Sequence, residues 1–264
     1  MKLPADKVNQ LRMFYEGRGV CVTGGAGFIG GHLCDALLSL GASITVLDDL
    51  SNSTTEHLSG LIELEPERVR FVHGSILDDD ALAAAICDGA GARYDGDQPK
   101  APCKTIFHLA ALGSVPRSVE EPQRTWSVNA TGTLRVLEAA RGRGKGGVNS
   151  TTRSSQVERV IAASSSSIYG NQPELPKVET QVPRPLSPYA ASKQAGEHLL
   201  ASYAACYGLS TVSLRFFNVF GPRQSAESAY AAVIPAFTKR LMDGEPPVIY
   251  GDGEQTRDFT YVGN

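Results

Sequence analysis

The segment 187–200, SPYAASKQAGEHLL, places Tyr189 and Lys193 four residues apart. In a helix this spacing puts both side chains on one face. An ammonium group beside a phenol favours the phenolate, and lowering the pKa of a tyrosine from about 10 to about 7 needs about 4 kcal/mol of differential stabilisation. Tyr189 would then be a usable general base at neutral pH. The spacing alone is common on ordinary helix surfaces, so the rest of the chain must support it.

Four consecutive serines, Ser164 to Ser167, stand between the apolar run VERVIAA and a Tyr-Gly pair. A serine cluster by itself is typical of a loop or a flexible spacer. The preceding run, however, has the composition of a buried strand of a parallel sheet, and ligands bind just past the carboxyl ends of such strands. We therefore expect these serines to form a strand tip that delivers hydroxyl groups to a site, with Ser164 only ending the strand.

A glycine-rich turn lies between the first apolar run and the helical segment after it, in VCVTGGAGFIGGHLCDALL. Such glycines permit a tight turn and close approach of backbone N–H groups to a pyrophosphate, while the helix N-terminus favours negative charge. Asp48 closes the next apolar run, where an acidic side chain accepts hydrogen bonds from an adenosine ribose and repels a 2′-phosphate. The pattern predicts NAD rather than NADP as the cofactor, held at the turn by Gly24, Gly27, Phe28, Ile29 and Gly30.

Short apolar runs alternate with stretches of helical period along most of the chain. This alternation predicts an α/β fold, a Rossmann-type doubly wound parallel sheet. From about residue 218 the pattern becomes irregular and richer in proline, glycine and aromatic residues. We expect an NAD-binding domain at 1–217 and a smaller substrate-binding lobe at 218–264. The expected strands are GVCVTGG, SITVLDD, RVRFVHG, KTIFHLA, RVIAASS and STVSLRFFN, and the expected helices are 28–40, 54–64, 79–88, 121–141 and 187–207.

Composition limits the class of protein. With 264 residues, 42% of them hydrophobic, and a net charge of −3, the chain can bury a large core and has no global attraction to nucleic acid. It shows neither a signal peptide nor a membrane span, so we expect a cytoplasmic protein. Its five cysteines are scattered without a CxxC pair, and no metal site is expected. The stretches 88–103 and 141–156 are most simply surface loops.

Taken together, TGGAGFIG, SSSSIYG and YAASK resemble the extended short-chain dehydrogenase/reductase family, in its nucleotide-sugar branch. The further segments LAALGSVPRS, LPKVE, LRFFNVFGPRQ, AYAAVIPAF and GDGEQTRDFTYV are similar to bacterial UDP-sugar 4-epimerases, those acting on UDP-N-acetylglucosamine most of all. The resemblance implies an NAD-dependent isomerase with a UDP-sugar as its substrate. It also implies a homodimer in which the segments 121–141 and 187–207 pair as a four-helix interface.

The resemblance implies a catalytic set of Ser165, Tyr189 and Lys193. Tyr189 would remove the proton of the sugar 4-hydroxyl while hydride passes from C4 to NAD, and the 4-keto sugar would turn over and take the hydride back on its other face. Ser165 would hold the 4-oxygen and relay the proton. Related dehydratases carry carboxylates at the positions of both Ser166 and Ser167, and related decarboxylases usually carry a glutamate at the position of Ser167. Two hydroxyls there favour epimerisation over elimination.

The other expected site residues also follow from the resemblance. One departure from the family pattern is Ser75, where relatives usually have an aspartate facing the adenine amine, so we expect a weaker contact there. The expected cofactor contacts are Asp48, Asp49, Asn52, Ser53, Ser75, Ile76, Leu109, Ala110, Ala111 and Asn129, together with Tyr189 and Lys193. The expected substrate contacts are Ser114, Arg117, Ser165, Ser166, Asn218, Val233, Tyr250 and Arg257.

Alternatives to the UDP-hexose 4-epimerase stay open at this stage. One is a UDP-glucuronate 4-epimerase or another nucleotide-sugar modifying enzyme of the same family. Another is an NAD-binding protein that has lost turnover. Members of the family continue well past the DFTYV strand, so we expect the sequence to be incomplete and the substrate-binding lobe to be partial.

Overall fold

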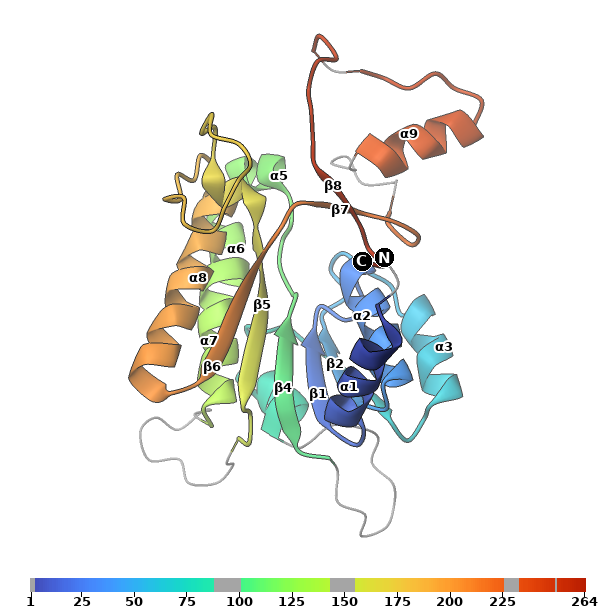
Figure 1. The fold of residues 1–264 in the computed structure, drawn as a ribbon, viewed down its shortest axis with the longest axis vertical. Helices are drawn as coiled ribbons and strands as arrows, with labels where there is room; N and C mark the ends of the chain where they lie inside the picture. Colours follow the sequence, from blue (N-terminus) through green and yellow to red (C-terminus); the bar gives the residue numbers. More distant parts are fainter. Residues whose placement is uncertain (1–2, 88–100, 143–154, 226–232, 250) are drawn as a thin grey trace.

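The computed structural model describes residues 3–87, 101–142, 155–225, 233–249 and 251–264 (Figure 1). Its centre is a six-stranded sheet of order β3-β2-β1-β4-β5-β6, in which every pair of neighbours is parallel. This order confirms the predicted doubly wound fold, with its change of direction between β1 and β4. The strands are β1 (Gly19–Thr23), β2 (Ser43–Asp48), β3 (Val69–His73), β4 (Cys103–His108), β5 (Arg159–Ser165) and β6 (Ser210–Phe216).

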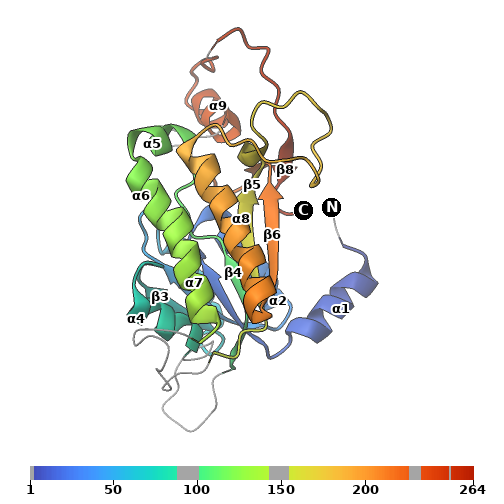
Figure 2. The same ribbon diagram turned by 90° about the vertical axis from the view of Figure 1, so that its left-hand side faces the viewer.

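Helices cover both faces of the sheet (Figures 1 and 2). The helices α4 to α8 lie on one face, and α2 and α3 lie on the other. The helices are α1 (Ala5–Tyr15), α2 (Phe28–Ser39), α3 (Glu56–Leu64), α4 (Asp79–Leu82), α5 (Val115–Glu120), α6 (Pro122–Trp126), α7 (Gly132–Ala140) and α8 (Pro188–Tyr207).

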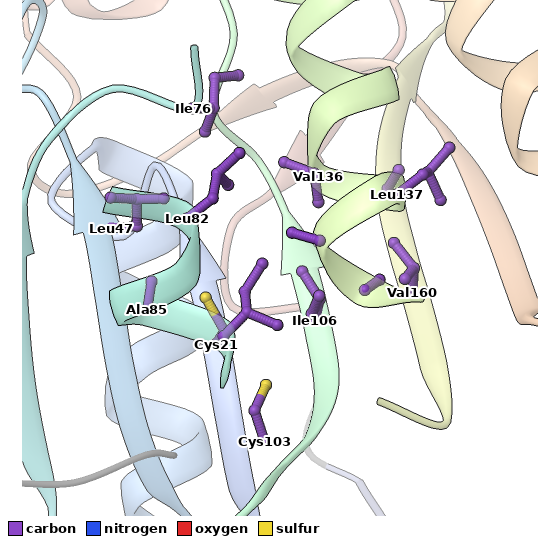
Figure 3. Packing of buried hydrophobic residues seen from close by; sticks show 14 of the residues in the cluster. Cys21, Leu47, Ile76, Leu82, Ala85, Cys103, Ile106, Val136, Leu137 and Val160 are labelled. Atoms are coloured by element: carbon purple, nitrogen blue, oxygen red, sulfur yellow. The ribbon is translucent and has the colours of Figure 1, made fainter. Parts of the chain in front are cut away.

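The strands bury both of their faces, which explains their nearly continuous apolar sequences. In β1, Val20 and Val22 pack on the side of α2 and α3, while Cys21 between them packs on the other side. Ile106 of β4 and Val136 of α7 belong to the same cluster as Cys21 (Figure 3). Because side chains alternate along a strand, two separate cores hold the sheet from opposite sides.

The helix that carries the Tyr-Lys pair begins at a defined residue. The hydroxyl of Ser187 accepts a hydrogen bond from the backbone N–H of Ala190, and Pro188 occupies the first helical position. Both features are typical helix starts. They fix Tyr189 in the first turn of α8, next to the end of β5, with which α8 packs.

A second, two-stranded sheet forms from β7 (Asn218–Phe220) and β8 (Phe259–Tyr261), and α9 (Val233–Met242) lies beyond it (Figure 1). The turn after β7 contacts α2, because Arg223 donates a hydrogen bond to Asp35 at 2.7 Å. The ring of His32 is also hydrogen-bonded to the carbonyl oxygen of Pro222 at 3.0 Å. These contacts fasten the C-terminal segment beside the glycine-rich turn.

Three helices, α1, α5 and α9, and two interruptions were not predicted. Helix α1 buries none of its residues, so it has no apolar stripe that a pattern search could detect. The short helix α5 is set by its N-cap Ser114 rather than by periodicity. The expected helix 121–141 is divided by the π-helical turn Ser127–Thr131, and the expected helix 79–88 ends as the π-helical turn Ala83–Cys87. No helix in the described part of the chain has the length and apolar character needed to cross a membrane.

Candidate active site

A cleft of about 360 Å³ opens at the carboxyl ends of the central strands. Its walls are the loops that follow β1, β2, β3 and β4, which the topology brings to one edge of the sheet. Of the expected cofactor contacts, the cleft is lined by Gly24, Gly27, Asp48, Asp49, Asn52, Ser53, Ser75, Ile76, Leu109, Ala110 and Ala111.

Two glycines of the glycine-rich turn, Gly24 and Gly30, have no room for a side chain. A Cβ atom on Gly24 would lie 2.6 Å from the backbone nitrogen of Ala110, and Gly24 also has a φ of +73°. A Cβ atom on Gly30 would lie 2.2 Å from the carbonyl oxygen of Gly24. The N-terminus of α2 follows immediately, and no side chain caps it. Free backbone N–H groups at a helix N-terminus beside a cleft suit a pyrophosphate.

Asp48 organises the loops around this cleft. Its Oδ2 atom accepts a hydrogen bond from the N–H of Ala26 at 3.0 Å, and its Oδ1 atom accepts from the N–H of Leu50 at 2.9 Å and from the hydroxyl of Ser53 at 3.0 Å. A carboxylate offers about four acceptor positions, so one on Oδ2 remains for a ligand hydroxyl. Asp48 therefore has a structural role in addition to the expected contact with the cofactor.

The lining of the cleft includes residues that the sequence analysis did not identify. Arg124 lies on α6, and Ser127 and Val128 belong to the π-helical turn after it. Ser127 and Val128 directly precede Asn129 in the sequence, and Arg124 lies five residues before it, but no motif marks them. Conversely, the expected cofactor contacts that do not line this cleft within the described part of the chain are Phe28, Ile29, Gly30, Asn129, Tyr189 and Lys193.

The expected catalytic hydroxyl contacts the expected base. The side chain of Ser165 faces the phenol of Tyr189 closely enough to act on it in the direction that lowers its pKa. The Oγ atom of Ser165 also accepts hydrogen bonds from the N–H of Ser167 at 3.1 Å and from its hydroxyl at 2.9 Å. With both lone pairs used, Ser165 has its own proton to donate to the Tyr189 oxygen. Ser166, the other serine expected at the site, is half-buried in the same turn.

Lys193 does not contact the phenol directly. Its Nζ atom lies 5.9 Å from the centre of the Tyr189 ring and donates a hydrogen bond to the carbonyl oxygen of Ala163 at 3.0 Å. Burial lowers the pKa of Lys193 to about 8. The pKa of Tyr189 is raised, because burial outweighs the hydrogen bond from Ser165. The direction differs from the sequence-based expectation of a lowered pKa, since desolvation disfavours the phenolate.

Asn129 connects the cofactor side of the site to α8. Its amide exchanges hydrogen bonds with the backbone of Leu112, accepting at 2.8 Å and donating at 3.2 Å, and it also donates to the hydroxyl of Ser192 at 3.1 Å. Ser192 in turn donates to the carbonyl oxygen of Tyr189 at 2.7 Å. Asn129 therefore holds the first turn of α8 against the loop after β4.

A buried histidine supports the same loop. The Nδ1 atom of His108 lies 2.8 Å from the hydroxyl of Thr23, and its Nε2 atom lies 3.0 Å from the hydroxyl of Thr133. Burial, together with the charge of Lys193, lowers the pKa of His108 to about 3. His108 is therefore neutral. The hydroxyl of Thr23 also accepts a hydrogen bond from the N–H of Ala110 at 3.3 Å, which places the end of β4 in the wall of the cleft.

The expected substrate contacts other than Ser165 and Ser166 fall in two places. Ser114 caps α5, and Arg117 donates a hydrogen bond to the side-chain oxygen of Asn52 at 3.1 Å, so α5 reaches the loop after β2. Asn218, Val233 and Arg257 lie exposed in the C-terminal segment. Tyr250 lies outside the described residues.

Comparison with known proteins identifies the family. Residues 20–264 match the NAD dependent epimerase/dehydratase family. The chain belongs to this family. A UDP-glucose 4-epimerase of Mycolicibacterium smegmatis is 38% identical over 242 residues, which cover 91% of this chain and 68% of that protein. This relationship places the glycine-rich turn and the Tyr-Lys pair in an epimerase/dehydratase enzyme.

Solved structures of the family show the same fold. A UDP-N-acetylglucosamine 4-epimerase from Methanobrevibacter ruminantium, in complex with UDP-N-acetylmuramic acid, matches with a TM-score of 0.77 and 40% identity over 94% of this chain and 70% of that one. A UDP-glucose 4-epimerase from Thermus thermophilus, in complex with NAD, matches with a TM-score of 0.76 and 37% identity over 93% and 71% of the two chains. NAD is the cofactor of this epimerase/dehydratase, and the uncapped helix and glycine turn fit its pyrophosphate.

Proposed function

We propose that the protein is a UDP-hexose 4-epimerase, acting between UDP-N-acetylglucosamine and UDP-N-acetylgalactosamine or between UDP-glucose and UDP-galactose. The observation that carries the proposal is the juxtaposition of Ser165 and Tyr189, with the hydroxyls of Ser166 and Ser167 beside them in one turn. This arrangement offers one base and several hydroxyls, and no carboxylate within the turn. The similarity to epimerases of UDP-glucose and UDP-N-acetylglucosamine supports the same substrate class.

The proposed chemistry divides between the cofactor and the chain. NAD, when bound, supplies the hydride acceptor and donor at sugar C4. Tyr189 takes the proton of the sugar 4-hydroxyl. Ser165 donates a hydrogen bond to the 4-oxygen or to the oxygen of Tyr189 and passes the proton between these two atoms. Lys193 brings a positive charge beneath the pair and holds α8 to β5. After the 4-keto sugar has turned over and hydride has returned to C4 on its other face, the 4-oxygen takes its proton back from Tyr189.

The proposed binding of the substrate uses both parts of the chain. Ser114 and Arg117 stand at one side of the cleft, where they would border the sugar. The exposed side chains of Asn218, Val233 and Arg257 would contact the diphosphate and uridine, and Tyr250 would stack on uracil. The planar guanidinium of Arg257 suits bidentate contact with phosphate.

The absence of acidic side chains in the serine turn separates this proposal from the other activities of the family. Dehydratases and decarboxylases are also among the relatives that match. Elimination and decarboxylation at C5 or C6 need an additional acid or base. Between Ser165 and Tyr169 this chain has only Ser166, Ser167 and Ile168. A UDP-glucuronate 4-epimerase has no such need, so it remains a second substrate choice for the same mechanism.

One assay tests the proposal. The protein is incubated with NAD and, separately, with UDP-N-acetylglucosamine, UDP-glucose and UDP-glucuronate, and proton NMR detects the galacto epimer. We expect turnover of one of the first two without added reductant, and loss of turnover in Tyr189→Phe. Turnover of UDP-glucuronate alone would move the assignment to that epimerase. Binding of NAD with no turnover of any of the three contradicts the proposal.

We also propose a homodimer. Val119 of α5 and Trp126 of α6 are 65% and 49% exposed. The helices α5 and α6 pack beside α8 (Figure 2). Large apolar side chains grouped on one exposed face favour association with a second copy. Light scattering after size exclusion should give twice the monomer mass for the wild type. For Trp126→Glu the measured mass should fall towards that of the monomer. A monomeric wild-type protein at micromolar concentration contradicts this part of the proposal.

A further inference from the structure

A partly buried ion pair lies directly behind the serine turn. Arg215 of β6 donates to Glu197 of α8 through two bonds, from Nε to Oε1 at 3.0 Å and from Nη2 to Oε2 at 2.9 Å. The two side chains are only 16% and 15% exposed. A bidentate pair in this setting has fixed geometry, unlike an exposed ion pair, which contributes little.

Glu197 connects this pair to β5. Its Oε1 atom accepts a hydrogen bond from the hydroxyl of Ser164 at 2.5 Å. Ser164 is buried, so its role goes beyond the expected one of ending the strand. Three consecutive residues of β5 therefore contact α8: Ala163 contacts Lys193, Ser164 contacts Glu197 and Ser165 contacts Tyr189. Glu197 is the member of this set that lies furthest along α8 from Tyr189.

Arg215 connects the same pair to the turn after β5. Its Nη1 atom donates to the hydroxyl of Tyr169 at 3.1 Å, and its guanidinium lies 4.9 Å from the centre of that ring. Tyr169 closes the 3-10 turn Ser166–Tyr169. That turn contains Ser167, whose N–H and hydroxyl both point at the Oγ atom of Ser165. Arg215 therefore supports the group that orients the catalytic hydroxyl.

The charges of the pair are maintained inside the protein. Burial raises the pKa of Glu197, but the hydrogen bonds from Arg215 and Ser164 outweigh it and leave this pKa below its ordinary value. The pKa of Arg215 is raised, mainly by its hydrogen bond to Glu197. The charge of His198, next in sequence on α8, also lowers the pKa of this carboxylate. Glu197 therefore stays ionised at neutral pH.

We propose that Glu197 and Arg215 are positioning residues, which set the hydroxyl of Ser165 against the oxygen of Tyr189. The inference rests on the proposed function for the roles of Ser165 and Tyr189. Glu197 joins Ser164 of β5 to α8. Arg215 holds the turn after β5 through its hydrogen bond to Tyr169. The two residues act on the reaction only through the residues that they hold.

Two variants and a control test the proposal. Glu197→Gln sets an amide N–H₂ against the donors of Arg215, and Arg215→Lys keeps the charge but loses the fork. The control is Glu138→Gln, because Glu138 pairs with Arg141 at 3.0 Å and also accepts a hydrogen bond from Tyr203 of α8, towards the opposite end of that helix. Glu138→Gln therefore removes an acidic contact to α8, as Glu197→Gln does, but none of the contacts of Glu138 in the described part of the chain involves Ser165.

We expect both test variants to lower kcat by about 10- to 100-fold, with KM for the UDP-sugar changed by less than about 3-fold, because small misplacements of reacting groups affect kcat most strongly. The acid limb of the kcat–pH profile should move to higher pH, since Tyr189 loses alignment with the hydrogen bond that lowers its pKa. Glu138→Gln should lower the melting temperature but leave kcat and the acid limb unchanged. An acid limb that stays in place in both test variants would overturn the proposal.

A second readout does not need turnover. The ultraviolet difference spectrum between each protein and its Tyr189→Phe derivative isolates the titration of Tyr189. We expect the midpoint to rise in Glu197→Gln and Arg215→Lys and to stay unchanged in Glu138→Gln. An unchanged midpoint in all three overturns the positioning role, whereas wild-type protein that turns over none of the sugars overturns only the proposed function.

Discussion

The Nζ atom of Lys193 donates a hydrogen bond to the carbonyl oxygen of Ala163 at 3.0 Å. This bond joins the second turn of α8 to β5, two residues before the strand ends at Ser165. It directs the ammonium group at the strand rather than at the phenol of Tyr189. Lys193 thus mainly holds α8 against β5, and it also places a positive charge near the site.

Lys193→Met is expected to be inactive yet more stable than the wild type at neutral pH. Burial lowers the pKa of Lys193 from 10.5 to about 8, so holding the charge inside costs the folded state about 3 kcal/mol at pH 7. The lost bond to Ala163 offsets about 1 kcal/mol of that gain. Chemical denaturation should therefore show a variant that is about 1–3 kcal/mol more stable.

The pH dependence of this difference checks its cause. Because the folded pKa is the lower one, the unfolded chain binds more protons between pH 8 and 10.5, and wild-type stability from this group rises with pH in that window. The advantage of Lys193→Met should therefore shrink as the pH rises from 8 towards 10.5. An advantage that stays constant over this range would show that packing, and not the buried charge, is responsible.

Asp48→Asn is expected to weaken NAD binding by at least about tenfold, as loss of a hydrogen bond to a charged group typically does. The new amide can keep one acceptor oxygen, but its N–H₂ group would face the N–H of Ala26 or that of Leu50. Asp78→Asn is the matched control, since Asp78 is exposed, accepts a hydrogen bond from the N–H of Asp80 at 2.9 Å and does not line the cleft. Isothermal titration with NAD measures both variants, and equal affinities would contradict the organising role of Asp48.

Gly30→Ala is expected to destabilise the protein by more than about 2 kcal/mol and to abolish NAD binding, because the added carbon would overlap the backbone of Gly24 and Gly25. Gly60→Ala in α3 is the control, where the added carbon meets no atom within 4 Å. In a helix interior that change should stabilise by about 0.5–1 kcal/mol. Thermal unfolding with and without NAD distinguishes them, and similar melting temperatures for the two variants would contradict the steric explanation.

Local patterns were enough to predict the sheet, the glycine turn and the Tyr-Lys helix. In each case neighbours in the sequence carry the signal: apolar runs for β1 and β2, a turn followed by a helix for Gly24 to Gly30, and a spacing of four for Tyr189 and Lys193. The topology then brings these segments to one edge of the sheet. Their meeting there follows from the fold class alone.

The supports of the site could not be predicted in this way. Ser164, Glu197 and Arg215 come from three elements, and each looks ordinary within its own segment. Only the pairing of β5 with β6, which sets Ser164 opposite Arg215, brings them together. The pKa of Tyr189 was mispredicted for a related reason, because desolvation depends on how α8 packs and no residue spacing reports it.

Ser165→Ala is expected to lose much more activity than Ser167→Ala. Removing the hydroxyl of Ser165 takes away the hydrogen bond that lowers the pKa of Tyr189, so this pKa should rise further and kcat should fall about 10²-fold or more, with the larger loss at low pH. Ser167→Ala removes one of the two donors to Ser165 and keeps the backbone N–H, so a loss of a few-fold and a smaller shift of the acid limb should follow. Steady-state kcat measured from acid to alkaline pH gives both quantities. If Ser167→Ala lost as much activity as Ser165→Ala, then Ser167 would itself have to contact the sugar, and its role as a support for Ser165 would be wrong.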